Sequence, residues 1–331
     1  MLRSLVRAID NDERLVRLVS QGVSGALGVC SVGGLGLVEH ALEARDLAAL
    51  TSGDTFCVVR GRRVRYRKLC AERAGPSVVL VNGLTGSLEQ WRIVQESLAR
   101  ESPVLAYDRG GMGFSDAMTP NDAEAQADEL AGVLESTGLS PPFVVVTYSA
   151  SALLASVFAL RHAALVRSLV FLDPILPGYA YIAPRIFLSQ VVKSFFGVLR
   201  FHARSHYGGP PASPEEAREH AVFARYPHWR ATAEDGIRLG NWESKLLGLP
   251  RFGDLRVGVL STFDEQLDYE KGAVDKSRAL AAQSTRGTFF GVRREHGPVE
   301  HSRLVTRADG AEVVVNFIRR ISRDASVELR P

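Results

Sequence analysis

Short apolar runs separated by helical stretches are the feature that most restricts how this chain can fold. Between residues 77 and 173 the runs are "SVVLVNG", "PVLAYD", "PFVVVTY" and "VRSLVFLD", with helical segments such as "LEQWRIVQESLAR" between them. Continuous Val, Leu and Phe runs that alternate with helices are typical of parallel strands whose two faces are both covered. The sequence therefore predicts an α/β fold built on a mostly parallel sheet.

Segments on either side extend this predicted sheet. Upstream, "TFCVVRG" and "RRVRYRKLC" alternate apolar and polar residues around Gly61, which indicates an antiparallel hairpin. Downstream, "LRVGVLST" and "GTFFGVRR" resume the sheet, and residues 308–321 read as a closing helix. Between the two parts, apolar residues recur at helical spacing, with proline and glycine punctuation. We predict a core of residues 51–173 and 251–331, with an inserted helical cap at 174–250.

Length and composition fit one large globular domain that carries such an insertion. The chain has 331 residues, of which 46% are hydrophobic and 23% are charged, and a single core stops growing at roughly 250–300 residues. The formal charge is only +3, and aromatic residues are not interleaved with basic runs. Nucleic acid is therefore a poor candidate partner. The three cysteines lack C-x-x-C spacing, which indicates free thiols.

The N-terminal residues 1–50 are expected to form a helical extension. Residues 18–38, "LVSQGVSGALGVCSVGGLGLV", carry no charge, and four arginines precede them. That length could span a bilayer with the N-terminus inside. However, the run contains six glycines, three serines and a glutamine, which favours a helix that packs apolar surfaces or lies on a membrane surface. We expect a cytoplasmic protein with membrane association through this segment as an alternative.

Ser149 is the strongest candidate nucleophile, because it follows an apolar strand and opens a helix in "PFVVVTYSASALLASVFAL". A tight strand-to-helix bend lets a serine hydroxyl project while the next backbone N–H, that of Ala150, faces a substrate oxygen. Thr147 and Ser151 stand where the usual pattern Gly-x-Ser-x-Gly has glycines. These replacements reduce packing room but keep the hydroxyl and the N–H. By itself, the motif fits a helix-capping serine equally well.

Two further motifs occur in the order found in a known family. "VVLVNGLTGSLEQW" ends a strand at Asn82-Gly83-Leu84, and "LAYDRGGMGFSDA" follows the next strand with Asp108 to Ser115. A strand ending in His-Gly, then Asp-x-x-Gly-x-Gly-x-Ser, then the serine bend resembles the α/β-hydrolase family, in its capped, serine-nucleophile esterase, haloperoxidase and C–C hydrolase branch. The resemblance implies an eight-stranded, mostly parallel sheet flanked by helices, with a helical cap. It also implies loop-organising roles for Asp108 and Arg109. The chain departs from the family at Asn82, where histidine is usual.

Serine catalysis needs an acid and a base, in the chain order Ser…Asp/Glu…His. The resemblance places the acid just past the seventh strand, where Asp264 lies at the family's offset. Glu265 and Asp268 are alternatives in the same loop. Asp173, at the end of the sixth strand, is another known kind of location for the acid in this fold. It ranks second because "FLDP" is also a common structural turn.

The base is expected in the loop before the closing helix, which contains His296 and His301. "SRLVTRADGAEVV" follows His301 and resembles the family's run from the catalytic histidine into that helix, so His301 is preferred. His296 lies almost on the strand end and is the alternative. The other six histidines show no metal-ligand grouping. We expect no metal and no cofactor.

These residues predict an acyl-transfer mechanism through a Ser-His-Asp triad. His301 would take the proton of Ser149, Asp264 would hold the imidazole, and the amides of Leu84 and Ala150 would form an oxyanion hole. The cap segment "YIAPRIFLSQVVKSFFGVLRF" is rich in apolar residues, which favours a small or medium hydrophobic ester or related acyl substrate.

Other functions fit the same residues. A C–C bond hydrolase or a haloperoxidase-like enzyme would use the same triad, whereas a serine at the elbow argues against epoxide and haloalkane hydrolysis. The altered elbow also fits a non-catalytic hydrolase-fold protein that binds a ligand. The uncharged N-terminal run favours a membrane-anchored lipid hydrolase or acyltransferase.

Overall fold

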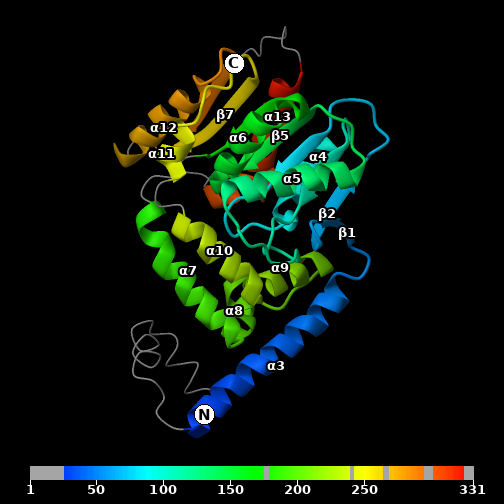
Figure 1. The fold of residues 1–331 in the computed structure, drawn as a ribbon, viewed down its shortest axis with the longest axis vertical. Coiled ribbons are helices and arrows are strands. Elements are labelled where there is room, and N and C mark those ends of the chain that lie inside the picture. Colours follow the sequence, from blue (N-terminus) through cyan, green and yellow to red (C-terminus); the bar gives the residue numbers. More distant parts are fainter. Residues whose placement is uncertain (1–25, 175–178, 239–241, 264–267, 294–300, 324–331) are drawn as a thin grey trace.

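The described part of the chain forms one eight-stranded sheet with helices on both faces (Figure 1). The computed structural model describes residues 26–174, 179–238, 242–263, 268–293 and 301–323. The strand order is β1-β2-β4-β3-β5-β6-β7-β8, with parallel pairing from β4 through β8. The strands are β1 (Thr55–Val59), β2 (Arg62–Leu69), β3 (Val78–Val81), β4 (Val104–Tyr107), β5 (Phe143–Tyr148), β6 (Val166–Leu172), β7 (Arg256–Phe263) and β8 (Gly287–Arg293). The predicted, mostly parallel eight-stranded sheet is confirmed.

Strands β1 and β2 form an antiparallel hairpin at one edge of the sheet. Val59 pairs with Arg62, which leaves a two-residue turn. Both turn residues have positive φ, +50° at Arg60 and +78° at Gly61. This is the conformation that matches the right-handed twist of the flanking strands. The hairpin predicted around Gly61 is confirmed.

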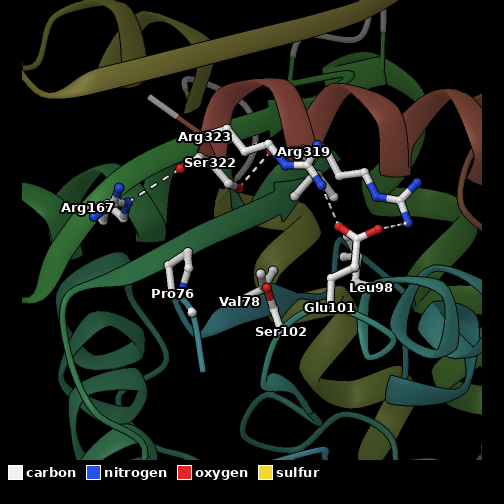
Figure 2. Close-up of a pocket in the computed structure, with 11 residues that line it drawn as sticks. Pro76, Val78, Leu98, Glu101, Ser102, Arg167, Arg319, Ser322 and Arg323 are labelled. Carbon is white, nitrogen blue, oxygen red and sulfur yellow. Dashed lines mark hydrogen bonds and ion pairs between the residues drawn. The ribbon is translucent and has the colours of Figure 1, made fainter. Parts of the chain in front are cut away.

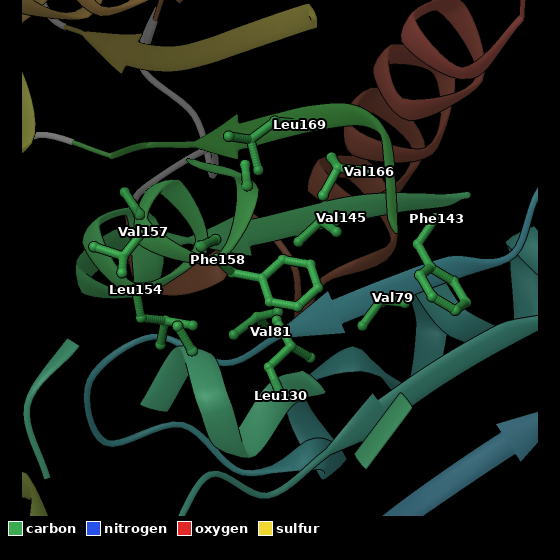
Figure 3. Close-up of a cluster of buried hydrophobic side chains, with 14 of the residues drawn as sticks. Val79, Val81, Leu130, Phe143, Val145, Leu154, Val157, Phe158, Val166 and Leu169 are labelled. Carbon is green, nitrogen blue, oxygen red and sulfur yellow. The ribbon is translucent and has the colours of Figure 1, made fainter. Parts of the chain in front are cut away.

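The central strands are buried on both faces. Every residue of β3, β4 and β5 is buried. Successive side chains point to opposite faces, so Val79 and Val81 join one apolar cluster with helices α5 (Ala123–Thr137) and α6 (Ala152–Arg161) (Figure 3). Val78 and Leu80 join the other, with α4 (Arg92–Leu98) and α13 (Ala308–Ser322). Burial of each such side chain contributes roughly 1.5–3 kcal/mol, which explains why continuous apolar runs mark these strands.

The core helices begin and end at residues suited to those positions. Helix α5, for example, starts after Asp122, whose side chain accepts a hydrogen bond from the Ala125 N–H at 2.8 Å, and it ends at Gly138, where φ is +68°. An N-capping carboxylate and a left-handed glycine are common at helix ends. The core helices are α4 (Arg92–Leu98), α5 (Ala123–Thr137), α6 (Ala152–Arg161), α12 (Asp268–Ala281) and α13 (Ala308–Ser322), the last being the predicted closing helix.

Between β6 and β7 the described chain is helical and lies beside the core as a cap (Figure 1). Helices α7 (Tyr179–Phe195) and α10 (Tyr226–Arg238) pack so closely that a Cβ atom added at Gly236 would lie 2.6 Å from the Phe187 ring. Phe187, Leu199, Trp229 and Ala233 form the apolar centre of this cap. The helices of the cap are α7 (Tyr179–Phe195), α8 (Val198–His206), α9 (Pro214–Ala224) and α10 (Tyr226–Arg238), whereas the following α11 (Trp242–Leu247) packs on α6 and α12 of the core.

Helix α3 (Ala26–Leu50) runs along the cap and away from the sheet (Figure 1). Ion pairs attach it to the cap, including Glu39 with Arg200 of α8 at 2.7 Å and Glu43 with Arg225, which follows α9, at 3.0 Å. Among the helices of the described residues, none combines the length and apolar character needed to cross a bilayer. Residues 18–25 of the uncharged run lie outside the described part.

Candidate active site

Ser149 lies directly after β5, at the first position of a short 3-10 turn that leads into α6. Its φ angle is +57°, a left-handed conformation that is uncommon for residues other than glycine. The residue is only 6% exposed. Strained backbone of this kind persists where the surrounding structure enforces it, and it clusters at functional sites. The strand-turn-helix context predicted for Ser149 is confirmed.

Ser151 stabilises this bend in the position where the family pattern has a glycine. Its Oγ accepts a hydrogen bond from the Tyr148 N–H at 3.0 Å. The same hydroxyl lies 2.9 Å from the Tyr148 carbonyl and 3.1 Å from the Val81 carbonyl of the neighbouring strand. The side chain thus links the turn to β3. The elbow therefore forms without either glycine of the usual pattern.

The loop after β3 packs against the Ser149 turn. Strands β3 and β5 are parallel neighbours, with Val81 opposite Thr147, so their following residues meet at one edge of the sheet. A Cβ atom added at Gly83 would lie 2.7 Å from the Tyr148 carbonyl and 3.1 Å from Cβ of Ser149. Only glycine fits this approach. The backbone segments that carry Leu84 and Ala150 therefore lie next to each other.

Asp173 and His301 contact each other at the same edge. Asp173 directly follows β6, the other neighbour of β5, with Tyr148 opposite Leu172. Its carboxylate is buried and lies 3.2 Å from Nδ1 of His301. The N–H and the hydroxyl of Thr262 donate to the two carboxylate oxygens at 2.5 and 2.8 Å. Asp173 is thus oriented by β7 and faces the imidazole.

The preferred acid of the sequence analysis, Asp264, lies outside the described residues, as do Glu265 and His296. Asp268 begins helix α12, but its side chain is not among those described. Among the described residues, the contact to His301 comes from Asp173, which ranked second on sequence alone.

Comparison with known proteins agrees with this architecture. Residues 76–208 match a family model described as the alpha/beta hydrolase fold. The chain has the α/β-hydrolase fold. It superposes over 80% of its length on 100% of the enol-lactonase from Burkholderia xenovorans, with a TM-score of 0.58 and 20% identity. A thermophilic esterase from Thermogutta terrifontis is matched over 82% of this chain and 98% of that one, with a TM-score of 0.56 and 19% identity.

Sequence relatives match shorter stretches of this chain. An AB hydrolase superfamily protein from Gibberella zeae is 32% identical over 88 residues, which are 26% of this chain and 27% of that protein. The matched stretches span between 8% and 41% of the length of the curated relatives reported for this chain.

Tyr148 is a site residue that the sequence analysis did not single out. Its ring stacks on the imidazole of His301, with centroids 4.8 Å apart and planes inclined by 21°. Its hydroxyl donates to the His301 backbone carbonyl. Trp91 contacts the same ring edge-on at 6.2 Å. An aromatic residue directly before the elbow serine was the available signal, and here it joins His301 to the turn that carries Ser149.

The loop from Asp108 to Ser115 has the organising role expected for this motif in the α/β-hydrolase fold. Asp108 is fully buried and accepts from the N–H groups of Leu88 at 2.7 Å and Phe114 at 2.9 Å. Burial raises the pKa of this carboxyl, although the neighbouring Arg65 opposes the change. A Cβ atom at Gly113 would overlap the Asp108 carboxyl at 2.1 Å. Asp108 thus fixes the backbone of the loop rather than facing the site.

Asn82 also has a structural role in place of the usual histidine. Its side chain is buried; Nδ2 donates to the Tyr107 carbonyl at 2.9 Å, and Oδ1 accepts from Gln90 at 3.2 Å. These contacts join the ends of β3 and β4. Asn82 therefore serves loop hydrogen bonding and adds no reactive group.

A cavity of about 570 Å³ lies at the opposite, amino edge of the sheet (Figure 2). Val78 and Arg167, near the starts of β3 and β6, line it together with the end of α13. There Glu101 pairs with Arg319 at 2.9 Å and with Arg323 at 2.7 Å. This cavity shares no residue with the candidate active site.

Proposed function

We propose that the protein is a serine hydrolase that cleaves hydrophobic esters or related acyl compounds. The observation that carries the proposal is the 3.2 Å contact between Nδ1 of His301 and the buried carboxylate of Asp173, beside an elbow whose serine has a φ of +57°. Serine catalysis needs a histidine held in one orientation by an acid. In this proposal Asp173 takes the role that the sequence analysis gave to Asp264.

The proposed reaction begins with attack of the Ser149 oxygen on a carbonyl carbon. Because Nδ1 of His301 faces Asp173, its Nε2 is the nitrogen that accepts the serine proton. That proton passes to the leaving-group oxygen as its bond to the acyl carbon breaks. His301 then deprotonates a water molecule, whose oxygen attacks the acyl-serine. As the bond between the acyl carbon and the Ser149 oxygen breaks, His301 returns this proton to the serine oxygen and the acid is released.

The backbone amides of Leu84 and Ala150 are the proposed oxyanion donors. The close approach of Gly83 to Ser149 supports this assignment. Leu84 follows Gly83 and Ala150 follows Ser149, so the two amides lie on adjacent backbone segments. Fixed donors aimed at a developing oxyanion are each worth about 100- to 1,000-fold in kcat.

The proposed substrate class rests on the surroundings of Leu84. Leu84 packs against the apolar cap cluster of Phe187, Leu199, Trp229 and Ala233. Apolar walls next to a reactive carbonyl favour hydrophobic acyl or alcohol groups. Solved structures with the same fold include an enol-lactonase, an esterase and a thioesterase domain, whose names all describe acyl chemistry. Epoxide hydrolases share the fold as well, but a serine at the elbow favours acyl transfer.

A series of p-nitrophenyl esters of increasing chain length tests this function. Purified protein should hydrolyse them, with the highest kcat/KM at short to medium chains, and Ser149→Ala should abolish turnover. His301→Ala should have an effect of similar size. His296→Ala, at the alternative base, is the matched control and should keep most of the activity. Equal hydrolysis by wild type and Ser149→Ala would contradict the proposal.

A further inference from the structure

Cap helix α10 contacts the loop of residues 83–85, which packs against Ser149. Leu84, in the middle of this loop, touches an apolar cluster that includes Trp229 and Ala233 of α10. The loop is also strained, because Thr85 has a φ of +60°. A strained loop keeps its shape only where its neighbours enforce it. Two buried polar contacts from α10 also reach the residues on either side of Leu84.

The contact to Gly83 runs through a buried arginine. Nη2 of Arg109 donates to the Gly83 carbonyl at 2.9 Å. Nη1 of the same guanidinium donates to the carboxylate of Asp235, on α10, at 2.8 Å. Arg109 is 2% exposed and Asp235 is 9% exposed. The planar guanidinium therefore links the cap carboxylate to the carbonyl that directly precedes Leu84.

The contact to Thr85 comes from His228 of α10. Its Nδ1 accepts a hydrogen bond from the Gly113 N–H at 3.2 Å, and the ring also bonds the Thr85 backbone. Burial, helped by Arg225 and Arg109, lowers the pKa of His228 to about 3. The ring is therefore neutral, with its other nitrogen as the donor. Its bonds join α10 to both loops near the elbow.

Asp235 is held in place by two further donors. Asn121 and Gln126 donate to its Oδ1 at 3.2 and 3.0 Å, while Oδ2 faces Arg109. Burying a charge pair is costly, so a buried pair is weak evidence for stability, and fixing a geometry is the role that its directed hydrogen bonds support. These hydrogen bonds fix the carboxylate of Asp235, which in turn can fix the guanidinium of Arg109.

We propose that Asp235 is a positioning residue for acyl transfer. Acting through Arg109, it holds the carbonyl of Gly83, and with it the amide of Leu84, in the geometry that binds the oxyanion. The oxyanion site is then complete only when α10 of the cap is docked. This inference rests on the proposed serine hydrolase function and extends it by making the cap part of the oxyanion site.

Asp235→Asn tests the role with little change in size. The amide oxygen still accepts from Asn121 and Gln126, but the charge opposite Arg109 is gone. On a p-nitrophenyl ester, kcat should fall about 10- to 100-fold, because a loosened donor loses part of the oxyanion stabilisation, while KM changes less than about threefold. Glu39→Gln breaks the ion pair between α3 and Arg200 of the cap, and should leave kcat unchanged.

A double variant separates positioning from a purely structural role. Arg109→Gln with Asp235→Asn leaves no unpaired buried charge, so Tm should recover relative to Asp235→Asn alone. The value of kcat should stay low, because the Gly83 carbonyl has lost its guanidinium donor. Recovery of kcat together with Tm would overturn the inference. If Asp235→Asn does not fold, Arg109→Lys replaces it and should lower kcat in the same way, since one ammonium cannot reproduce the two directed bonds.

Labelling with a fluorophosphonate separates the failure of this inference from that of the proposed function. Wild type that is labelled at Ser149, with kcat unaffected by Asp235→Asn, would overturn the positioning role alone. Wild type that is not labelled would overturn both.

Discussion

Polar groups at the two edges of the sheet differ in burial and in backbone conformation. At the carboxyl edge, Ser149 and Asp173 are buried with φ values of +57° and +45°, and helix α10 covers the neighbouring loop. At the amino edge, a cavity of about 570 Å³ is lined by the ion pairs of Glu101 with Arg319 and Arg323, whose side chains are 29% to 69% exposed. The comparison teaches that this cavity is not where the molecule concentrates strain and buried polar contacts.

Asp173→Asn, at the carboxyl edge, should cause the largest loss of activity among the following variants. The amide leaves the geometry nearly intact but no longer supports the imidazole in the required tautomer, and a change of this kind lowers kcat by about 10⁴-fold in a serine protease triad. We expect a loss of about 10³- to 10⁴-fold in ester hydrolysis, measured as kcat, with little change in Tm.

Asp264→Asn is the matched comparison for the choice of acid. If Asp173 is the orienting acid, this variant should keep kcat within a few-fold of wild type. A large loss in Asp264→Asn together with a small loss in Asp173→Asn would return the role to the residue that the family offset favours.

Glu129→Gln tests a buried carboxyl of α5 through the pH dependence of the free energy of unfolding. Glu129 accepts from the Gly110 N–H at 2.8 Å, and burial raises its pKa from 4.5 to about 7. The folded state therefore binds more protons than the unfolded state between these values, and stability falls as pH rises through this window. The glutamine keeps the acceptor without the charge. Urea titrations should show that its gain over wild type grows by about 2 kcal/mol between pH 5 and pH 8; a gain that does not depend on pH would contradict the buried-carboxyl account.

Glu101→Gln, at the amino edge, should have the smallest effect. Its two arginine partners are partly exposed, and exposed pairs contribute about 0–1 kcal/mol. The free energy of unfolding should fall by less than about 1 kcal/mol, and kcat should be unchanged. A loss of activity in this variant would show that the two edges are coupled.

Much of the fold could be predicted because its central strands are buried on both faces. Continuous apolar runs such as Val78–Val81 and Phe143–Tyr148 have few other stable environments, and the hairpin turn at Gly61 requires positive φ. The order of motifs then indicated Ser149. Apolar runs and turn residues are local features, so a single sequence is enough to recognise them.

The acid and the cap contacts could not be predicted in the same way. Strands β6 and β7 are parallel neighbours, with Leu172 opposite Leu260, so the sequence alone does not decide between an acid after β6 and an acid after β7. The hydrogen bonds from Thr262 to Asp173 join positions 89 residues apart. The pair of Arg109 and Asp235 spans 126 residues, and neither residue carries a local pattern that names its partner.

The most direct test of the central claim is covalent trapping of the nucleophile. Wild-type protein would be treated with a fluorophosphonate, digested, and analysed by mass spectrometry, beside Ser149→Ala and His301→Ala. The account predicts one modified peptide that carries the adduct on Ser149, no such adduct in Ser149→Ala, and labelling slowed by several orders of magnitude in His301→Ala. No adduct on Ser149 in wild type, or labelling at an unchanged rate in His301→Ala, would contradict it.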